Sequence, residues 1–118
     1  MAAPAGEYNI VTDQGSTFTR TLTWKDSGDS PVDLTGYTAR MQVKEDWKSG
    51  TPLVLELTTS NGRISLGGVA GTITLSISAT DMANVTAGTF VYDLEMVLST
   101  TVSRLVQGSF TIRPEVTK

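Results

Sequence analysis

Apolar and polar residues alternate with a period of two along several short stretches of this chain. Residues 37–43 carry Tyr, Ala, Met and Val at every second position, opposite Thr, Arg and Gln. Residues 72–78 place Ile and Leu opposite Thr and Ser in the same way. This pattern predicts strands with one buried face and one face in water.

Strands of this kind recur along the whole sequence, and Gly, Pro, Asn, Asp and Ser separate them. This spacing is typical of an all-β sandwich or barrel. We expect strands at residues 8–12, 16–25, 37–45, 53–58, 63–66, 72–78, 89–98 and 102–113.

The connecting segments carry their own signals. Residues 26–31 form a polar loop, Asn61-Gly62 predicts a hairpin, and Ser99 to Thr101 turns the last hairpin. Residues 67–71 contain three glycines but no lysine of a phosphate-binding loop, so they too read as a hairpin connection. A single short helical turn is expected at residues 78–84, where Ser78 can cap it.

Apolar rows in the strands predict the core. The longest row consists of Phe90, Tyr92, Leu94, Met96 and Leu98. A second row near the C-terminus consists of Val106, Phe110 and Ile112.

Arg20 interrupts another apolar row, because it lies between Phe18 and Leu22, with Trp24 next in phase. A buried unpaired guanidinium is too costly to retain. Arg20 therefore reaches the sandwich rim with its stem packed beside Phe18 and Leu22, or it meets a carboxylate. A third option is a sheet edge where Arg20 meets an acidic group or a backbone carbonyl of a neighbouring subunit.

The length of 118 residues predicts one domain, residues 1–118. With 39% hydrophobic and 18% charged residues, the chain is expected to fold rather than to be disordered. An N-terminal arm (1–7) and a C-terminal tail (114–118) carry no core pattern, so we expect them to be mobile in isolation.

Charge and composition exclude several classes of function. A net charge of −3 with scattered basic residues argues against nucleic acid as a partner. No apolar run is long enough to cross a membrane, and no export signal is visible. The chain has no cysteine and no histidine, which removes disulfides, thiol nucleophiles and zinc sites built on these residues. We expect no cofactor and no metal.

Two clusters of acidic residues are candidate sites. Asp26, Asp29 and Asp33 lie close together, but the calcium-loop pattern is absent, so solvated turn carboxylates are the favoured interpretation. Asp93 and Glu95 share a strand face and could form an acid/base pair. Cross-strand ion pairing with basic residues of neighbouring strands, Arg40, Lys44 and Arg104, is favoured instead.

Aromatic residues raise the alternative of a carbohydrate-binding surface. Trp24 and Tyr37 share phase with core rows, whereas Trp47 lies in the polar segment EDWKSG (45–50). Only Trp47 is therefore a plausible exposed contact.

Several segments resemble a family of small proteins of tailed bacteriophages and prophages. They are YNI (8–10), QGSTF (14–18), LTWKD (22–26), PVDLTGYTARMQV (31–43), LSISATD (75–81), AGTFVYDLE (87–95) and GSFTIRPEVT (108–117). The chain is similar to the N-terminal domain of the baseplate upper protein of lactococcal phages. The resemblance implies an immunoglobulin-like antiparallel β-sandwich of about seven to eight strands, located in a virion.

The matching segments carry no catalytic motif. The baseplate upper proteins continue into domains that hold receptor-binding proteins, and this chain stops at Lys118, so direct host binding is not expected.

The sequence thus favours a non-enzymatic structural protein of a tailed phage, either a baseplate or tail adaptor or a capsid cement protein. Its expected partners are other phage structural proteins, in multiple copies per particle. The candidate interface residues are Arg20, Trp47, Lys48, Arg113 and Glu115. The alternative is a carbohydrate-binding module that uses Trp47, and a hydrolase based on Asp93 and Glu95 is a distant third.

Overall fold

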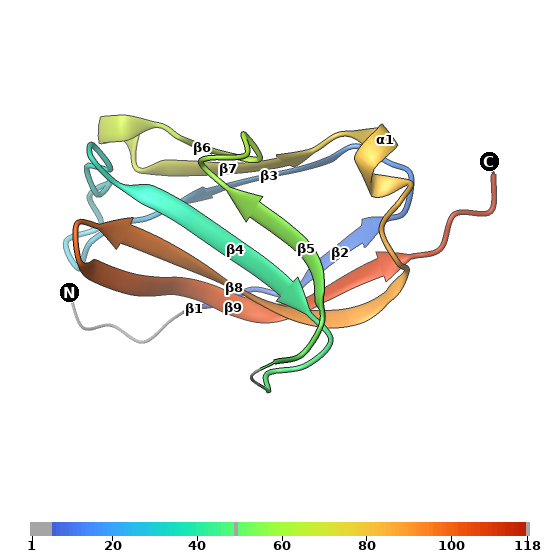
Figure 1. Ribbon diagram of the computed structural model, residues 1–118. Coiled ribbons are helices and arrows are strands. Elements are labelled where there is room, and N and C mark those ends of the chain that lie inside the picture. Colours follow the sequence, from blue (N-terminus) through green and yellow to red (C-terminus); the bar gives the residue numbers. More distant parts are fainter. Residues whose placement is uncertain (1–5, 49, 118) are drawn as a thin grey trace.

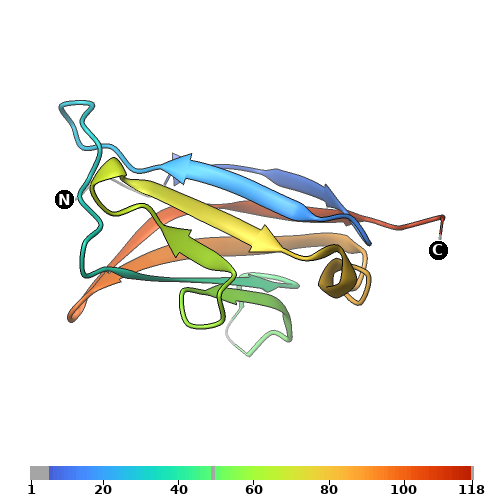
Figure 2. The same ribbon diagram turned by 90° about the horizontal axis from the view of Figure 1, so that it is seen from above.

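The computed structural model describes residues 6–48 and 50–117 and shows two β-sheets packed face to face (Figure 1). The larger sheet has the strand order β1-β9-β8-β4-β5, with β2 also paired to β9, and the smaller sheet has the order β3-β7-β6. Seen from above, the smaller sheet lies over the larger one (Figure 2). The strands are β1 (Gly6–Glu7), β2 (Ile10–Asp13), β3 (Phe18–Thr23), β4 (Thr38–Lys44), β5 (Leu53–Thr58), β6 (Ile64–Leu66), β7 (Thr72–Ile77), β8 (Gly88–Leu98) and β9 (Thr101–Arg113).

The prediction of an all-β sandwich is confirmed. All eight expected strands are present, and β5 has the expected bounds. A ninth strand, β1, lies inside the segment that was expected to be a mobile arm. Both β1 and β2 pair with β9 in parallel, so the sandwich is not purely antiparallel.

One short helix is present, as predicted. Helix α1 (Ala79–Met82) begins after Ser78, whose side chain accepts a hydrogen bond from the Asp81 backbone N–H at 3.1 Å. Its single buried residue is Met82, which packs into the core. The helix covers one end of the sandwich, close to the segment that follows β9 (Figure 1).

The prediction of a hairpin at Asn61-Gly62 is wrong. The turn is present, but β5 pairs with β4 in the larger sheet and β6 pairs with β7 in the smaller sheet. The Asn61 side chain holds the turn by accepting from the backbone N–H groups of Thr58 and Arg63, both at 3.0 Å. The turn therefore carries the chain from one sheet to the other. The other Gly-rich connection, between β6 and β7, does join a hairpin and contains a 3-10 turn, Gly68–Ala70.

The core lies between the sheets and joins them through aromatic rings. Phe18 of β3 and Phe110 of β9 are fully buried, with ring centroids 5.5 Å apart, and Tyr92 of β8 packs edge-on against Phe110. Two predicted core residues lie elsewhere. Leu98 is 39% exposed because it ends β8 at the hairpin tip, and Val106 is only half-buried beside a register shift opposite Leu94.

Within the described ranges, no helix is long and apolar enough to span a bilayer.

Candidate functional site

Arg20 of β3 links the two sheets at one side of the sandwich. Its guanidinium donates to the backbone oxygen of Val11 in β2 and to that of Thr19, each at 2.9 Å. It also lies over the Phe18 ring, 5.1 Å from the centroid. The position at the rim is confirmed, and no described carboxylate forms an ion pair with it. Strand β3 is an edge strand, but the carbonyl partner belongs to the same chain and links the two sheets.

We expect Arg20→Ala to lower the free energy of unfolding by about 1 kcal/mol, because two exposed hydrogen bonds from a charged donor and the contact with the Phe18 ring are lost. Arg20→Lys keeps the charge but not the planar fork that reaches two carbonyls, so it should recover less than half of this loss. Urea denaturation of the three proteins measures both effects. Unchanged stability of Arg20→Ala would show that the contact with Val11 contributes nothing in solution.

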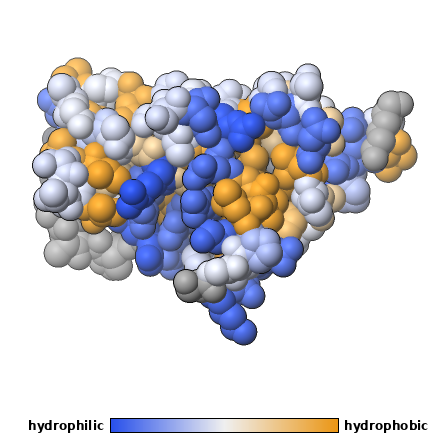
Figure 3. Space-filling view, in the orientation of Figure 1, coloured by the Kyte–Doolittle hydropathy of each residue, from blue (hydrophilic) through white to orange (hydrophobic). Residues whose placement is uncertain are grey.

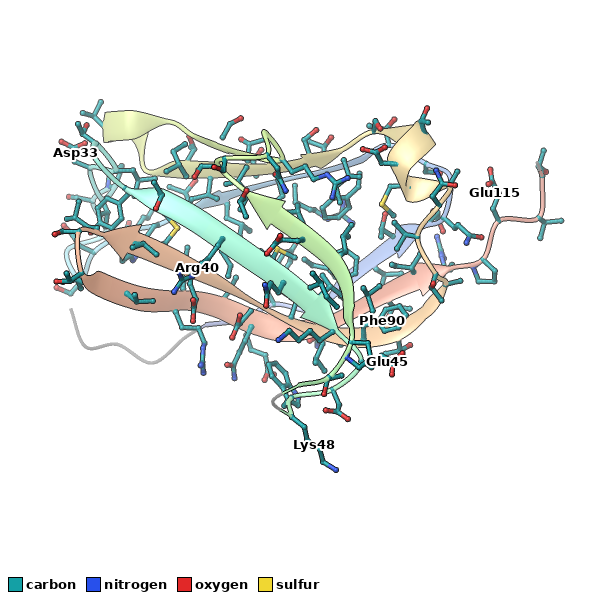
Figure 4. All side chains as sticks on the ribbon, in the orientation of Figure 1. Asp33, Arg40, Glu45, Lys48, Phe90 and Glu115 are labelled. Carbon is teal, nitrogen blue, oxygen red and sulfur yellow. The ribbon has the colours of Figure 1, made fainter. Side chains whose placement is uncertain are left out.

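The β4–β5 loop forms one wall of a groove on the outer face of the larger sheet. Asp46 shapes the loop by accepting from the Lys48 backbone N–H at 2.7 Å and from the Thr51 hydroxyl at 2.8 Å, and these bonds hold its pKa below the usual value. Trp47 is 58% exposed, as the sequence predicted. Lys48 lies at the loop tip and points away from the body (Figure 4).

We call this feature the Trp47 groove. It has a volume of about 640 Å³, and its lining includes Trp47, Arg40, Gln42, Lys44, Asp93 and Glu95. Strands β4 and β8 place their outward side chains next to one another across the antiparallel pair, because Arg40 is in register with Glu95 and Gln42 with Asp93.

Two acidic residues of the groove, Asp93 and Glu95, are held in ion pairs. Arg40 Nε lies 2.8 Å from Glu95 Oε1, and Arg104 Nε lies 3.3 Å from Asp93 Oδ2, so the predicted cross-strand pairing is confirmed. Burial raises the pKa of Asp93, with a further rise from Glu95, while Arg104 and Lys44 act against it. Asp93 and Glu95 thus each have their own arginine. This arrangement suits a rigid, salt-bridged surface or the recognition of polar groups.

The three turn carboxylates do not converge on one point. Asp26 Oδ1 accepts from the backbone N–H groups of Gly28 and Ser30, Asp29 pairs with Lys25 at 3.6 Å, and Asp33 accepts from Thr35. The Thr35 hydroxyl and backbone N–H hold the pKa of Asp33 below its usual value. Among the described residues, no group of three potential ligands could hold a metal ion.

Two predicted interface residues are engaged inside the chain. Arg113 ends β9 and makes two bonds to the Asp13 carboxylate, at 2.7 and 3.1 Å, which hold the pKa of Asp13 low. The Glu115 backbone N–H donates to Gln14 Oε1 at 3.0 Å. This bond holds the chain at Glu115, and the mobility of the tail in isolation stays a prediction. The next residue, Val116, is 95% exposed to solvent.

The structure reveals an apolar surface that sequence reasoning missed. Strand β5 is an edge of the larger sheet, and beside it lies a cavity of about 330 Å³ next to α1. We call this surface the β5 seam. Its apolar lining consists of Leu53 and Val54 and of the buried Leu55 and Val85, and its polar lining consists of Glu56, Arg63, Asp81 and Asn84. Leu53 is 49% exposed. The signal was present in the sequence, because three successive apolar residues in a strand cannot all face one core.

Neither known protein families nor curated protein sequences yield a match for this chain.

Proposed function

We propose that this protein is a non-enzymatic structural component of a tailed bacteriophage particle, present in multiple copies and bound to other particle proteins. It acts there as a baseplate or tail adaptor or as capsid cement. The segment resemblance described above supports this proposal, and the immunoglobulin-like topology that it implies is part of it.

The observation that carries the proposal is the open edge of β5, where Leu53 is 49% exposed and Val54 is half-buried. Exposed apolar patches on sheet edges are aggregation hazards, and proteins usually protect such edges. In Figure 3 an apolar area lies beside the first half of β5, below α1. Most charged groups of the described surface, in contrast, are satisfied within the chain by partners such as those of Arg40, Arg63, Arg104 and Arg113. The surface thus offers a protein contact more readily than a reactive group.

The test is mass spectrometry of phage particles purified by density gradient from the strain that encodes the chain. We expect the protein in the particle fraction, at a copy number comparable with that of other structural proteins. Analysis of separated heads and tails then distinguishes cement from adaptor. Recovery only from the particle-free lysate would overturn the proposal.

A second candidate function rests on the Trp47 groove. The groove has a volume of about 640 Å³ and is bordered by a tryptophan that is 58% exposed. Its lining includes paired charged groups, so it could bind a glycan. Glycan-array binding that Trp47→Ala abolishes and Trp47→Phe retains in part would support it. Val69→Ala is a suitable control, because Val69 is also exposed but lies on the 3-10 turn.

A further inference from the structure

The Asn61-Gly62 turn joins the two sheets, because it carries the chain from β5 of the larger sheet to β6 of the smaller one (Figure 1). Both residues of the turn are exposed to solvent. Gly62 has a φ of 82°, in the left-handed region that favours glycine, and a Cβ there would meet nothing within 4 Å. The backbone conformation therefore requires glycine at this position, whereas packing does not.

An asparagine followed by glycine is open to a spontaneous reaction of its own side chain. The backbone nitrogen of Gly62 attacks Cγ of Asn61, and its proton passes through solvent to the amide nitrogen, which leaves as ammonia. The cyclic imide that remains takes up water at either of its two carbonyls and opens to aspartate or isoaspartate. The reaction consumes only water, and glycine favours it because no side chain hinders the attacking nitrogen.

The two other asparagines of the chain are poorer sites for this reaction. Asn9 is followed by Ile10 and Asn84 by Val85, and both of these neighbours are branched at Cβ. A branched side chain crowds the attacking nitrogen and restricts its backbone. Asn61 is thus the asparagine that should react first, and Asn9 and Asn84 serve as controls within the same molecule.

The native turn restrains the Asn61 side chain. Its Oδ1 accepts from the backbone N–H groups of Thr58 and Arg63, both at 3.0 Å, and its Nδ2 donates to the backbone oxygen of Glu56 at 3.1 Å. The Asn61 N–H donates to Thr58 Oγ1 at 2.9 Å. Ring closure turns the amide onto the backbone, and loss of ammonia removes the Nδ2 donor itself. The reaction therefore requires these bonds to break and the turn to open.

The products of the reaction disturb the crossing between the sheets. A carboxylate in place of the amide cannot donate to the Glu56 oxygen, which then keeps the Arg63 guanidinium, at 3.0 Å, as its side-chain donor. Arg63 also pairs with Asp81 of α1 at 3.1 Å, so a new carboxylate at position 61 competes for the same guanidinium. Isoaspartate does more, because it inserts an additional carbon into the backbone between β5 and β6.

We propose that Asn61 is a modification site, at which the side chain deamidates spontaneously when the crossing from β5 to β6 opens, and that the isoaspartate product weakens the link between the two sheets. The extent of modification thus measures how often this crossing opens during the life of the protein. The inference goes beyond the proposed function and does not depend on it, since it is tested on the purified chain alone.

Peptide mapping by mass spectrometry tests the site in the whole chain, kept in mildly alkaline buffer with or without denaturing guanidinium chloride. In the denaturant we expect Asn61 to convert to the acid at least about tenfold faster than Asn9 and Asn84. Without it, Asn61 should convert about tenfold more slowly than in the denaturant, yet still ahead of the other two. Equal rates at Asn61 in both buffers would overturn the control by the turn. A rate no higher than those of Asn9 and Asn84 in either buffer would overturn the site.

Thr58→Val tests the restraint itself. It removes the hydroxyl that accepts from the Asn61 N–H but keeps the backbone N–H that donates to Asn61 Oδ1. Conversion of Asn61 should become about threefold faster in the folded protein and stay unchanged in guanidinium chloride. Thr111→Val is the control, because it removes a hydroxyl of β9 that bonds Thr89 at 3.5 Å. An unchanged rate in folded Thr58→Val would contradict the role of these bonds.

The effect of the product is measured by urea denaturation of the isoaspartate form, separated by chromatography. Asn61→Asp carries the same carboxylate on a backbone of normal length, so it separates the lost donor from the added carbon. We expect the urea midpoint of Asn61→Asp to lie below that of the unmodified protein, and that of the isoaspartate form to lie lower still. An isoaspartate form that unfolds at the same urea concentration as the unmodified protein would overturn the weakened link.

Discussion

Gly108→Ala is expected to lower the free energy of unfolding by about 3 kcal/mol, at the upper end of overpacking costs. A Cβ at this position would lie 2.5 Å from the backbone oxygen of Tyr8 and 2.7 Å from Asn9 Oδ1. Neither atom belongs to a flexible side-chain end, since the first is backbone and the second is held by the Ser109 N–H at 3.0 Å. The residues around Gly108 must therefore shift.

The cost is high because several bonds meet at this crossing. The chain leaves β1 and enters β2 directly over Gly108, with the Tyr8 N–H bonded to the Gln107 oxygen at 3.0 Å. The Tyr92 hydroxyl donates to the Tyr8 oxygen at 2.5 Å, and Tyr92 is in register with Gly108. Burial raises the pKa of Tyr92 well above its usual value, so the hydroxyl stays protonated and remains a donor. Displacing Tyr8 would strain all of these contacts.

Gly6→Ala is the matched control for Gly108→Ala. Gly6 also pairs with β9, but a Cβ there would lie 3.6 Å from Val106 Cγ1, which is an ordinary contact. The stability of Gly6→Ala should be unchanged or slightly higher, because alanine lowers the conformational entropy of the unfolded chain. Urea denaturation curves of the two variants give the comparison. Similar curves for both would show that the crossing can relax at little cost.

The strands of this protein could be predicted because period-two alternation is a local property. Expected and observed bounds differ by a few residues at most, as for 37–45 against Thr38–Lys44. The cap of α1 is equally local, since Ser78 and Asp81 lie three residues apart. Trp47 was assigned to the surface correctly because its segment contains no apolar neighbours.

Apart from the neighbours of β8, most strand partners could not be predicted, because alternation does not say which strand lies alongside which. Gly6–Glu7 carries no apolar residue, and only its pairing with β9 makes it a strand. Asn61-Gly62 was recognised as a turn, but its side-chain bonds serve equally well between sheets. The partner of Arg20 is a carbonyl nine residues away, which only the packing of β2 against β3 brings close.

The Trp47 groove could be predicted in part from the sequence, whereas the β5 seam could not. The ion pairs of the Trp47 groove follow from outward residues on adjacent strands, so they were anticipated once β4 and β8 were expected to be neighbours. The β5 seam depends on β5 being an edge and on the position of α1, and both are properties of the assembled sandwich.

Phe110→Ala is expected to have the largest effect, lowering the free energy of unfolding by about 4 kcal/mol. Phe110 is fully buried and lies between the sheets, where its ring contacts Phe18 at 5.5 Å and Tyr92 at 6.0 Å between centroids. It is also in register with Ile10 of β2 and with Phe90 of β8. Truncation leaves a cavity at the point where both sheets and the parallel strand meet. A loss of this size approaches the whole stability of a small domain, roughly 5 to 15 kcal/mol.

Two further variants separate the cavity from the ring contacts. Phe110→Leu nearly conserves volume, so it should cost less than about 1.5 kcal/mol if the cavity dominates. A double-mutant cycle with Phe18→Ala should show coupling of about 1 kcal/mol, because the two rings touch across the sheets. Calorimetry and urea denaturation measure these changes, with Val11→Ala as the control at a half-exposed position of β2. If Phe110→Leu proved as costly as Phe110→Ala, the ring contacts rather than the filled volume would join the two sheets.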